Sequence, residues 1–177
     1  MEPTRIAQAV CESAFEAIRE LLGPGLALQA KCQTELKHKP EIEQSLIEVT
    51  CLQYDESPIQ TLVLRVLFDH LSRQLKVTNI LMPQGMQHQR LGKRTLGELY
   101  KVAEAHDYEL LVVDMVASFY DRLVCRGAVV VDDHSVKITA QMNFSGDVDK
   151  ATSKTGPAVH DLFSLILGKP DKVKEAN

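Results

Sequence analysis

Residues 109–116 constrain the fold most, because they read ELLVVDMV and carry apolar side chains almost without alternation. A strand with one face in water alternates apolar and polar residues, whereas a strand covered on both faces does not. The run therefore predicts a buried strand of a partly parallel sheet. Helical patterns at residues 95–106 and 117–123 lie on either side of it in the sequence.

The rest of the chain predicts one more helix and several further strands. Apolar residues at helical spacing indicate a first helix over residues 4–22, and Gly23-Pro24-Gly25 is expected to end it. Strand patterns follow at residues 26–33, 45–54, 61–68, 76–82, 127–131 and 136–142. Residues 59–75 also fit a helix, and that alternative stays open. The order of elements predicts an α+β or α/β fold around a mixed sheet.

The chain has 177 residues, 45% of them apolar, which is enough for one domain with a full core. We expect that domain over residues 1–144. Residues 145–177 are expected to form a linker, a short amphipathic helix and a charged tail. No apolar run approaches the ~20 residues that a membrane span needs, and no secretory signal is visible.

Four cysteines show neither a C-x-x-C pair nor zinc-ligand spacing with the six histidines. Without a signal peptide, we expect reduced thiols in a cytoplasmic protein. The turn Asp132-Asp133-His134 is interpreted as solvated rather than metal-binding. No metal site is therefore predicted.

The net charge and its local distribution indicate which class of ligand the chain can bind. Lys and Arg number 20 against 24 Asp and Glu, so the net charge is −4, and nucleic acid is not expected as a partner. A local basic cluster of Arg90, Lys93 and Arg94 nevertheless lies between a strand pattern and a helix pattern. The N–H groups and the dipole at the start of a helix favour anions, and Gly92 lets the backbone approach a phosphate closely. This turn therefore predicts a ligand that carries a pyrophosphate.

The same turn resembles the GNAT superfamily of acyl-coenzyme A-dependent N-acyltransferases. That family's loop reads Q/R-x-x-G-x-G/A; Gln89 and Gly92 match its first two marked positions, and Arg94 occupies the third. The family continues with a helix, an apolar strand, a short tyrosine-bearing helix and a hairpin, and the patterns up to residue 142 follow this order. The resemblance implies a GNAT-like fold, with a mostly antiparallel sheet split in a V and flanked by helices.

The resemblance also implies a reaction, the transfer of an acetyl (acyl) group from acetyl-coenzyme A to an amine by direct attack. The pyrophosphate would lie on the turn, and the pantetheine arm would lie along the preceding strand. The residues implied for cofactor binding are Met82, Gln89, Arg90, Leu91, Gly92, Lys93, Arg94 and Thr95. Tyr120 matches the tyrosine that protonates the departing thiolate in many members.

The general base stays open among acidic and basic residues on or beside expected strands. The candidates are Glu48, the pair Asp69-His70, and Asp114, and Asp114 is preferred because the family's cleft opens beside its strand. The amine acceptor, a small molecule or a protein, and homodimer formation also stay open.

A second hypothesis retains the fold without catalysis. Arg94 occupies a position where the family prefers a small residue, and Val124-Cys125 interrupts the family's pattern after the tyrosine helix. Under this hypothesis the chain is an interaction protein that binds a protein partner.

Overall fold

The computed structural model describes residues 3–27, 30–53, 60–82 and 90–144. The chain divides into two units, Met1–Gly146 and Asp147–Asn177. The linker, helix and tail expected over residues 145–177 lie outside the described residues. Within the described part, three helices accompany a seven-stranded mixed sheet, so the fold is α+β.

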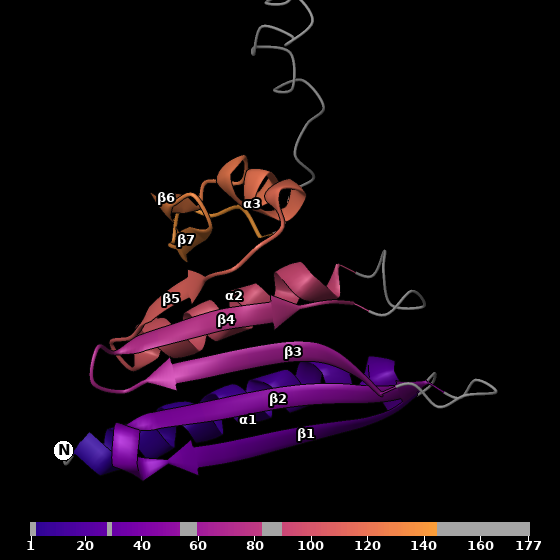
Figure 1. Ribbon diagram of the computed structural model, residues 1–177, viewed down its shortest axis with the longest axis vertical. Helices are drawn as coiled ribbons and strands as arrows, with labels where there is room; N and C mark the ends of the chain where they lie inside the picture. Colours follow the sequence, from indigo (N-terminus) through magenta and orange to yellow (C-terminus); the bar gives the residue numbers. More distant parts are fainter. Residues whose placement is uncertain (1–2, 28–29, 54–59, 83–89, 145–177) are drawn as a thin grey trace, which may run out of the picture. The chain divides into compact units, whose positions relative to one another are not determined.

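Figure 1 shows how the elements follow one another. In chain order they are α1 (Pro3–Ala27), β1 (Ala30–Lys39), the 3-10 helix η1 (Pro40–Ile42), β2 (Gln44–Gln53), β3 (Gln60–Asp69), β4 (Gln74–Ile80), α2 (Leu91–Ala105), β5 (Glu109–Val112), α3 (Ala117–Val124), β6 (Val129–Asp132) and β7 (Ser135–Ile138). The strand order across the sheet is β1-β2-β3-β4-β5-β7-β6. Only the β4–β5 pair is parallel among these neighbours, which confirms a mixed and mostly antiparallel sheet.

Several predicted boundaries are wrong. The helical alternative for residues 59–75 fails, because this stretch forms β3 and the start of β4. Helix α1 continues to Ala27 instead of ending at Gly23. A proline removes its own N–H bond to the preceding turn, and a 25-residue helix tolerates that loss near its end. Helix α2 begins four residues earlier than expected, at Leu91.

One face of the sheet holds the core. Helix α1 packs on β1 and β2, α2 packs on β4 and β5, and the two helices contact each other. Alternate residues of β2 face the side of the sheet that α1 covers. These residues, Ser45, Ile47, Val49 and Cys51, are all buried. This period of two is what a strand with one covered face requires.

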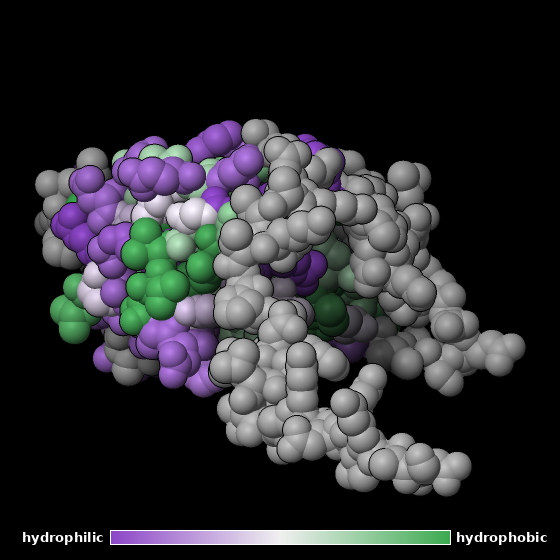
Figure 2. Space-filling view, turned by 90° about the horizontal axis from the view of Figure 1, so that it is seen from above, coloured by the Kyte–Doolittle hydropathy of each residue, from purple (hydrophilic) through white to green (hydrophobic). Residues whose placement is uncertain are grey.

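The sheet ends at an exposed apolar strand. All four residues of β6 are exposed, and Val129, Val130 and Val131 each leave about half of their surface in solvent. Figure 2 shows an apolar patch framed by hydrophilic residues on the molecule seen from above. An apolar sheet edge of this kind is a surface on which another chain can pair.

The structure also bears on two expectations, about membrane-spanning segments and about the redox state of the cysteines. None of the described helices is long and apolar enough to cross a membrane. The expectation of four reduced thiols is wrong at Cys51, which is disulfide-bonded, while Cys11 and Cys125 are free. On the backbone, Cys51 of β2 lies directly opposite Cys32 of β1.

Candidate functional site

The parallel strands β4 and β5 separate after a short pairing. Residues 74–77 of β4 pair with residues 109–112 of β5, and the Val113 N–H then donates to the Val77 carbonyl at 3.0 Å. Strand β4 continues to Ile80. In the part of the chain that the structure describes, no strand pairs with this edge of β4 beyond Val77. We call this open segment of strand the split.

A β-bulge on β4 sets the direction of the backbone groups at the split. The β3–β4 register shifts so that Thr78 is an extra residue on β4. Beyond it, the Leu81 N–H donates to the Val63 carbonyl at 2.7 Å. Because hydrogen-bonding direction alternates along a strand, the N–H and carbonyl of Ile80 point away from β3. They therefore face the split.

The bulge also leaves one polar atom unsatisfied. The Thr78 hydroxyl oxygen is buried and has no hydrogen-bond partner among the described residues. A buried polar group without a partner costs free energy in the absence of a ligand or water.

The start of α2 lies against the open end of β4. A Cβ added at Gly92 would lie 3.7 Å from Ile80 Cδ1 and 4.0 Å from Met82 Cγ. Among the described residues, no side chain caps this helix end, whose N-cap residue, Arg90, has a left-handed φ of 56°. The first-turn N–H groups of a helix, such as that of Gly92, have no acceptor within the helix. The structure thus brings a helix start and an open strand edge together.

The residues implied for cofactor binding differ in how exposed their side chains are to solvent. Leu91 and Thr95 are buried, and the Thr95 hydroxyl donates to the Leu91 carbonyl at 2.8 Å, so neither side chain faces solvent. Arg90 and Arg94 are exposed. The backbone cradle implied for this turn is shorter than expected, because the Arg94 N–H already donates to the Arg90 carbonyl at 3.1 Å. Gln89 lies outside the described residues.

The charges at this helix start oppose its own dipole. Arg90, Lys93 and Arg94 surround the N-terminal end, and no acidic residue occupies the first turn. The N-terminal end of a helix carries a partial positive charge, so cations there reduce stability unless an anion lies nearby. Local features that disfavour folding are typical of functional sites. Positive charge gathered at a helix start is a feature that attracts anions.

The two implied catalytic residues lie on or before α3. Asp114 lies two residues after the end of β5 and is exposed, with a left-handed φ of 55°. The Tyr120 hydroxyl donates to the Asp132 carbonyl of β6 at 3.2 Å. This bond ties Tyr120 to the β6–β7 hairpin.

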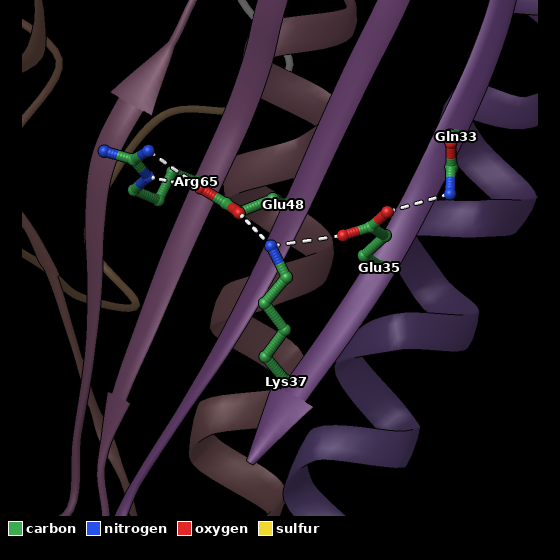
Figure 3. Close-up of polar contacts among 5 residues, drawn as sticks. All are labelled: Gln33, Glu35, Lys37, Glu48 and Arg65. Atoms are coloured by element: carbon green, nitrogen blue, oxygen red, sulfur yellow. Dashed lines mark hydrogen bonds and ion pairs between the residues drawn. The ribbon is translucent and has the colours of Figure 1, made fainter. Parts of the chain in front are cut away.

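Glu48 is unsuited to be a base, although the sequence left it as a candidate. Figure 3 shows its carboxylate between Lys37 and Arg65, with nitrogen–oxygen distances of 2.8 and 2.7 Å. The hydrogen bonds from Lys37 and then Arg65 lower the pKa of Glu48. A carboxylate held this way takes up protons poorly. Asp69 is also paired, with Lys76 at 3.3 Å.

A second polar cluster, which the sequence analysis missed, lies elsewhere in the fold. Ser45, Tyr108 and His38 join His70 in one hydrogen-bonded group. The sequence indicates His70 as a candidate base and His38 only as part of a charged loop, whereas the structure places His38 in β1. A usable signal was Ser45, because it is a polar residue in phase with the buried apolar face of β2.

Comparisons with known proteins leave the family open. No protein-family description and no curated protein matches the chain. One solved structure that matches is described as "Crystal structure of putative acetyltransferase from Agrobacterium tumefaciens". It has 11% sequence identity and a TM-score of 0.31, over 69% of this chain and 88% of that one. A TM-score this low does not establish a shared fold or activity.

Proposed function

We propose that the chain is an acyl-coenzyme A-dependent N-acyltransferase that binds its coenzyme where β4 and β5 separate. The observation that carries the proposal is the open edge of β4 beside the basic, uncapped start of α2. A strand edge can hold an extended, amide-bearing arm such as pantetheine by backbone hydrogen bonds. A helix start can hold the pyrophosphate at the other end of that arm. The resemblance to the GNAT superfamily supports the same assignment.

The backbone of the split supports the following reaction. The Ile80 N–H, which faces the split, would donate to the thioester carbonyl and stabilise the oxyanion that forms there. The acceptor amine attacks the carbonyl carbon, a C–N bond forms, and the C–S bond breaks. The amine proton goes to Asp114 or to water. The departing thiolate takes the proton of Tyr120, whose hydroxyl must first leave the Asp132 carbonyl.

Calorimetric titration of the full chain with coenzyme A tests binding. We expect saturable binding that Gly92→Glu abolishes, because the new carboxylate lies against the phosphates. Gly23→Glu is the matched control, since it adds the same charge on α1, where nothing lies within 4 Å of the added Cβ. A wild-type chain that does not bind coenzyme A would overturn the proposal.

Turnover tests the chemistry separately from binding. With acetyl-coenzyme A and a panel of amines, we expect release of free thiol. Tyr120→Phe should lower the rate and leave coenzyme affinity unchanged, since the phenol acts only as the thiolate departs. If the variant instead loses affinity, Tyr120 does not have this role.

A protein-binding role without catalysis is the second candidate. The exposed valines of β6 favour it, because they form an apolar sheet edge on the described part of the chain. This role predicts that the chain binds the coenzyme or a partner, and that acetyl-coenzyme A releases no free thiol with any amine. Replacing Val130 with lysine should then abolish capture of the partner and leave the fold intact.

A further inference from the structure

A cavity of about 500 Å³ lies at the other end of the sheet from the split. The start of α1, the β1–β2 and β3–β4 turns and Tyr108, just before β5, surround it. Figure 1 shows these segments at the end of the sheet opposite the start of α2. Helix α2 has 15 residues and therefore spans about 22 Å between the two ends. The cavity is thus separate from the split.

Four side chains from different segments form one continuous hydrogen-bonded chain in this cavity. His38 Nδ1 lies 2.9 Å from Ser45 Oγ, and Ser45 Oγ lies 2.8 Å from His70 Nε2. His70 Nδ1 lies 2.9 Å from the Tyr108 hydroxyl. All four residues line the cavity. We call them the relay.

The hydrogen bonds of the relay can be arranged in two ways, in which donors and acceptors exchange roles. In one arrangement His38 donates to Ser45, Ser45 donates to His70, and His70 donates to Tyr108. In the other arrangement each bond is reversed, and Tyr108 is the first donor. Each neutral imidazole has one donor and one acceptor nitrogen, and each hydroxyl can do both, so both arrangements satisfy every bond. The Tyr108 hydroxyl can therefore either donate to a ligand hydroxyl or accept from it.

Burial disfavours the charged forms of two members of the relay, His70 and Tyr108. Burial lowers the pKa of His70, and the neighbouring His38 adds to that effect, while Asp69 and Glu43 oppose it. Burial also raises the pKa of Tyr108. The charged residues that line the cavity are the exposed Glu43 and Arg73, whose charges are opposite. A ligand charge placed against the apolar part of the lining would be buried without a partner, which is costly.

The rest of the lining combines apolar residues with the side chains of Gln8 and Gln44. Ile6 and Ala7 from α1 and Pro40 from η1 contribute aliphatic surface. A cavity of this size, with apolar walls and a few convergent polar groups, is typical of small-molecule sites. Two groups with shifted pKa values, His70 and Tyr108, are among the lining residues, and such groups are common at functional sites.

We propose that this cavity is a second binding site, for a small uncharged molecule with an apolar body and one hydroxyl head. The apolar body lies against Ile6, Ala7 and Pro40. The hydroxyl bonds to Tyr108 and extends the relay. This site is independent of coenzyme A and of the reaction proposed at the split.

Phenol and toluene are suitable probes, because they share a shape and differ by the hydroxyl. Titration of the full chain, followed by the imidazole signals of His70 in ¹H–¹⁵N spectra, should give a saturable shift with phenol. Toluene should bind at least tenfold more weakly. Absence of a saturable phenol shift, or equal affinity for toluene, would overturn the proposal.

Tyr108→Phe tests the hydroxyl end of the relay. We expect it to remove the preference for phenol over toluene while the cavity still admits both. Tyr100→Phe is the matched control, because that hydroxyl bonds to Glu104 on the surface of α2, at 2.9 Å. If Tyr108→Phe does not fold, Ser45→Ala removes the central hydroxyl and should likewise reduce the preference. A preference that survives in the folded variant, or phenol displaced by coenzyme A, would contradict the assignment.

Discussion

Replacing Gly92 with alanine should move stability and coenzyme binding in opposite directions. The added Cβ would lie 3.7 Å from Ile80 Cδ1 and 4.0 Å from Met82 Cγ, which are ordinary van der Waals distances. The free protein therefore accepts the methyl group, and alanine favours a helix over glycine by up to about 1 kcal/mol. For a domain of this size we expect Tm to stay level or rise by about 2–4 °C.

The same methyl group occupies space between the helix start and the split, where the phosphates and the arm of the coenzyme would run. We expect the Kd for coenzyme A to rise at least tenfold, which corresponds to about 1.4 kcal/mol. Thermal melts give the first quantity and calorimetric titration gives the second. Gly97→Ala is the control, because it makes the same change in the middle of α2, 3.4 Å from Phe144, away from the helix start. Undiminished affinity in a well-folded Gly92→Ala protein would refute the close backbone approach.

Three further predictions concern the rest of the fold. Glu48→Gln should lower Tm by about 1–3 °C at pH 7, and this difference should vanish in acid. The ion pairs lower the folded-state pKa of Glu48, so their stabilisation is complete above the ordinary glutamate pKa and is lost as pH falls toward the lowered value. A difference that persists in acid contradicts the pairing. Cys125 should react with a thiol reagent in the native protein at pH 8, whereas Cys11 should react only after unfolding. Burial raises the pKa of the Cys11 thiol to about 11. Equal reaction rates for the two cysteines would contradict the burial of Cys11. Leu64→Ala should destabilise by about 2–5 kcal/mol in urea unfolding, because Leu64 is fully buried and the change leaves a cavity; a loss below 1 kcal/mol would show that the site is not packed as described.

The strands and helices could be predicted where the pattern is local. The alternation of β2 and the apolar stripe of α2 are each contained within one element, so periodicity alone indicates them. Helix α1 passed its expected end because proline and glycine weaken a helix without always stopping it. The helical alternative for residues 59–75 could not be excluded from the sequence, because pairing with distant strands decides such ambiguous segments.

The candidate site was predictable in part for the same reason. The basic turn before α2 is contiguous in the sequence, and its position after a strand indicates an anion site. The bulge at Thr78 was not predictable, since a register shift depends on which residues of β3 pair with β4. The relay was not predictable either, because His38, Ser45, His70 and Tyr108 come from four segments that meet only in the folded chain.

The most direct test of coenzyme binding at the split is the amide exchange of Ile80. Its N–H faces the open edge of β4, so a bound arm or thioester carbonyl would accept a hydrogen bond from it. We expect coenzyme A to slow hydrogen exchange at Ile80 and to shift the amide signals of Leu91 and Gly92 in the same titration. Unchanged exchange at Ile80, with unchanged signals at the start of α2, would contradict coenzyme binding at this site.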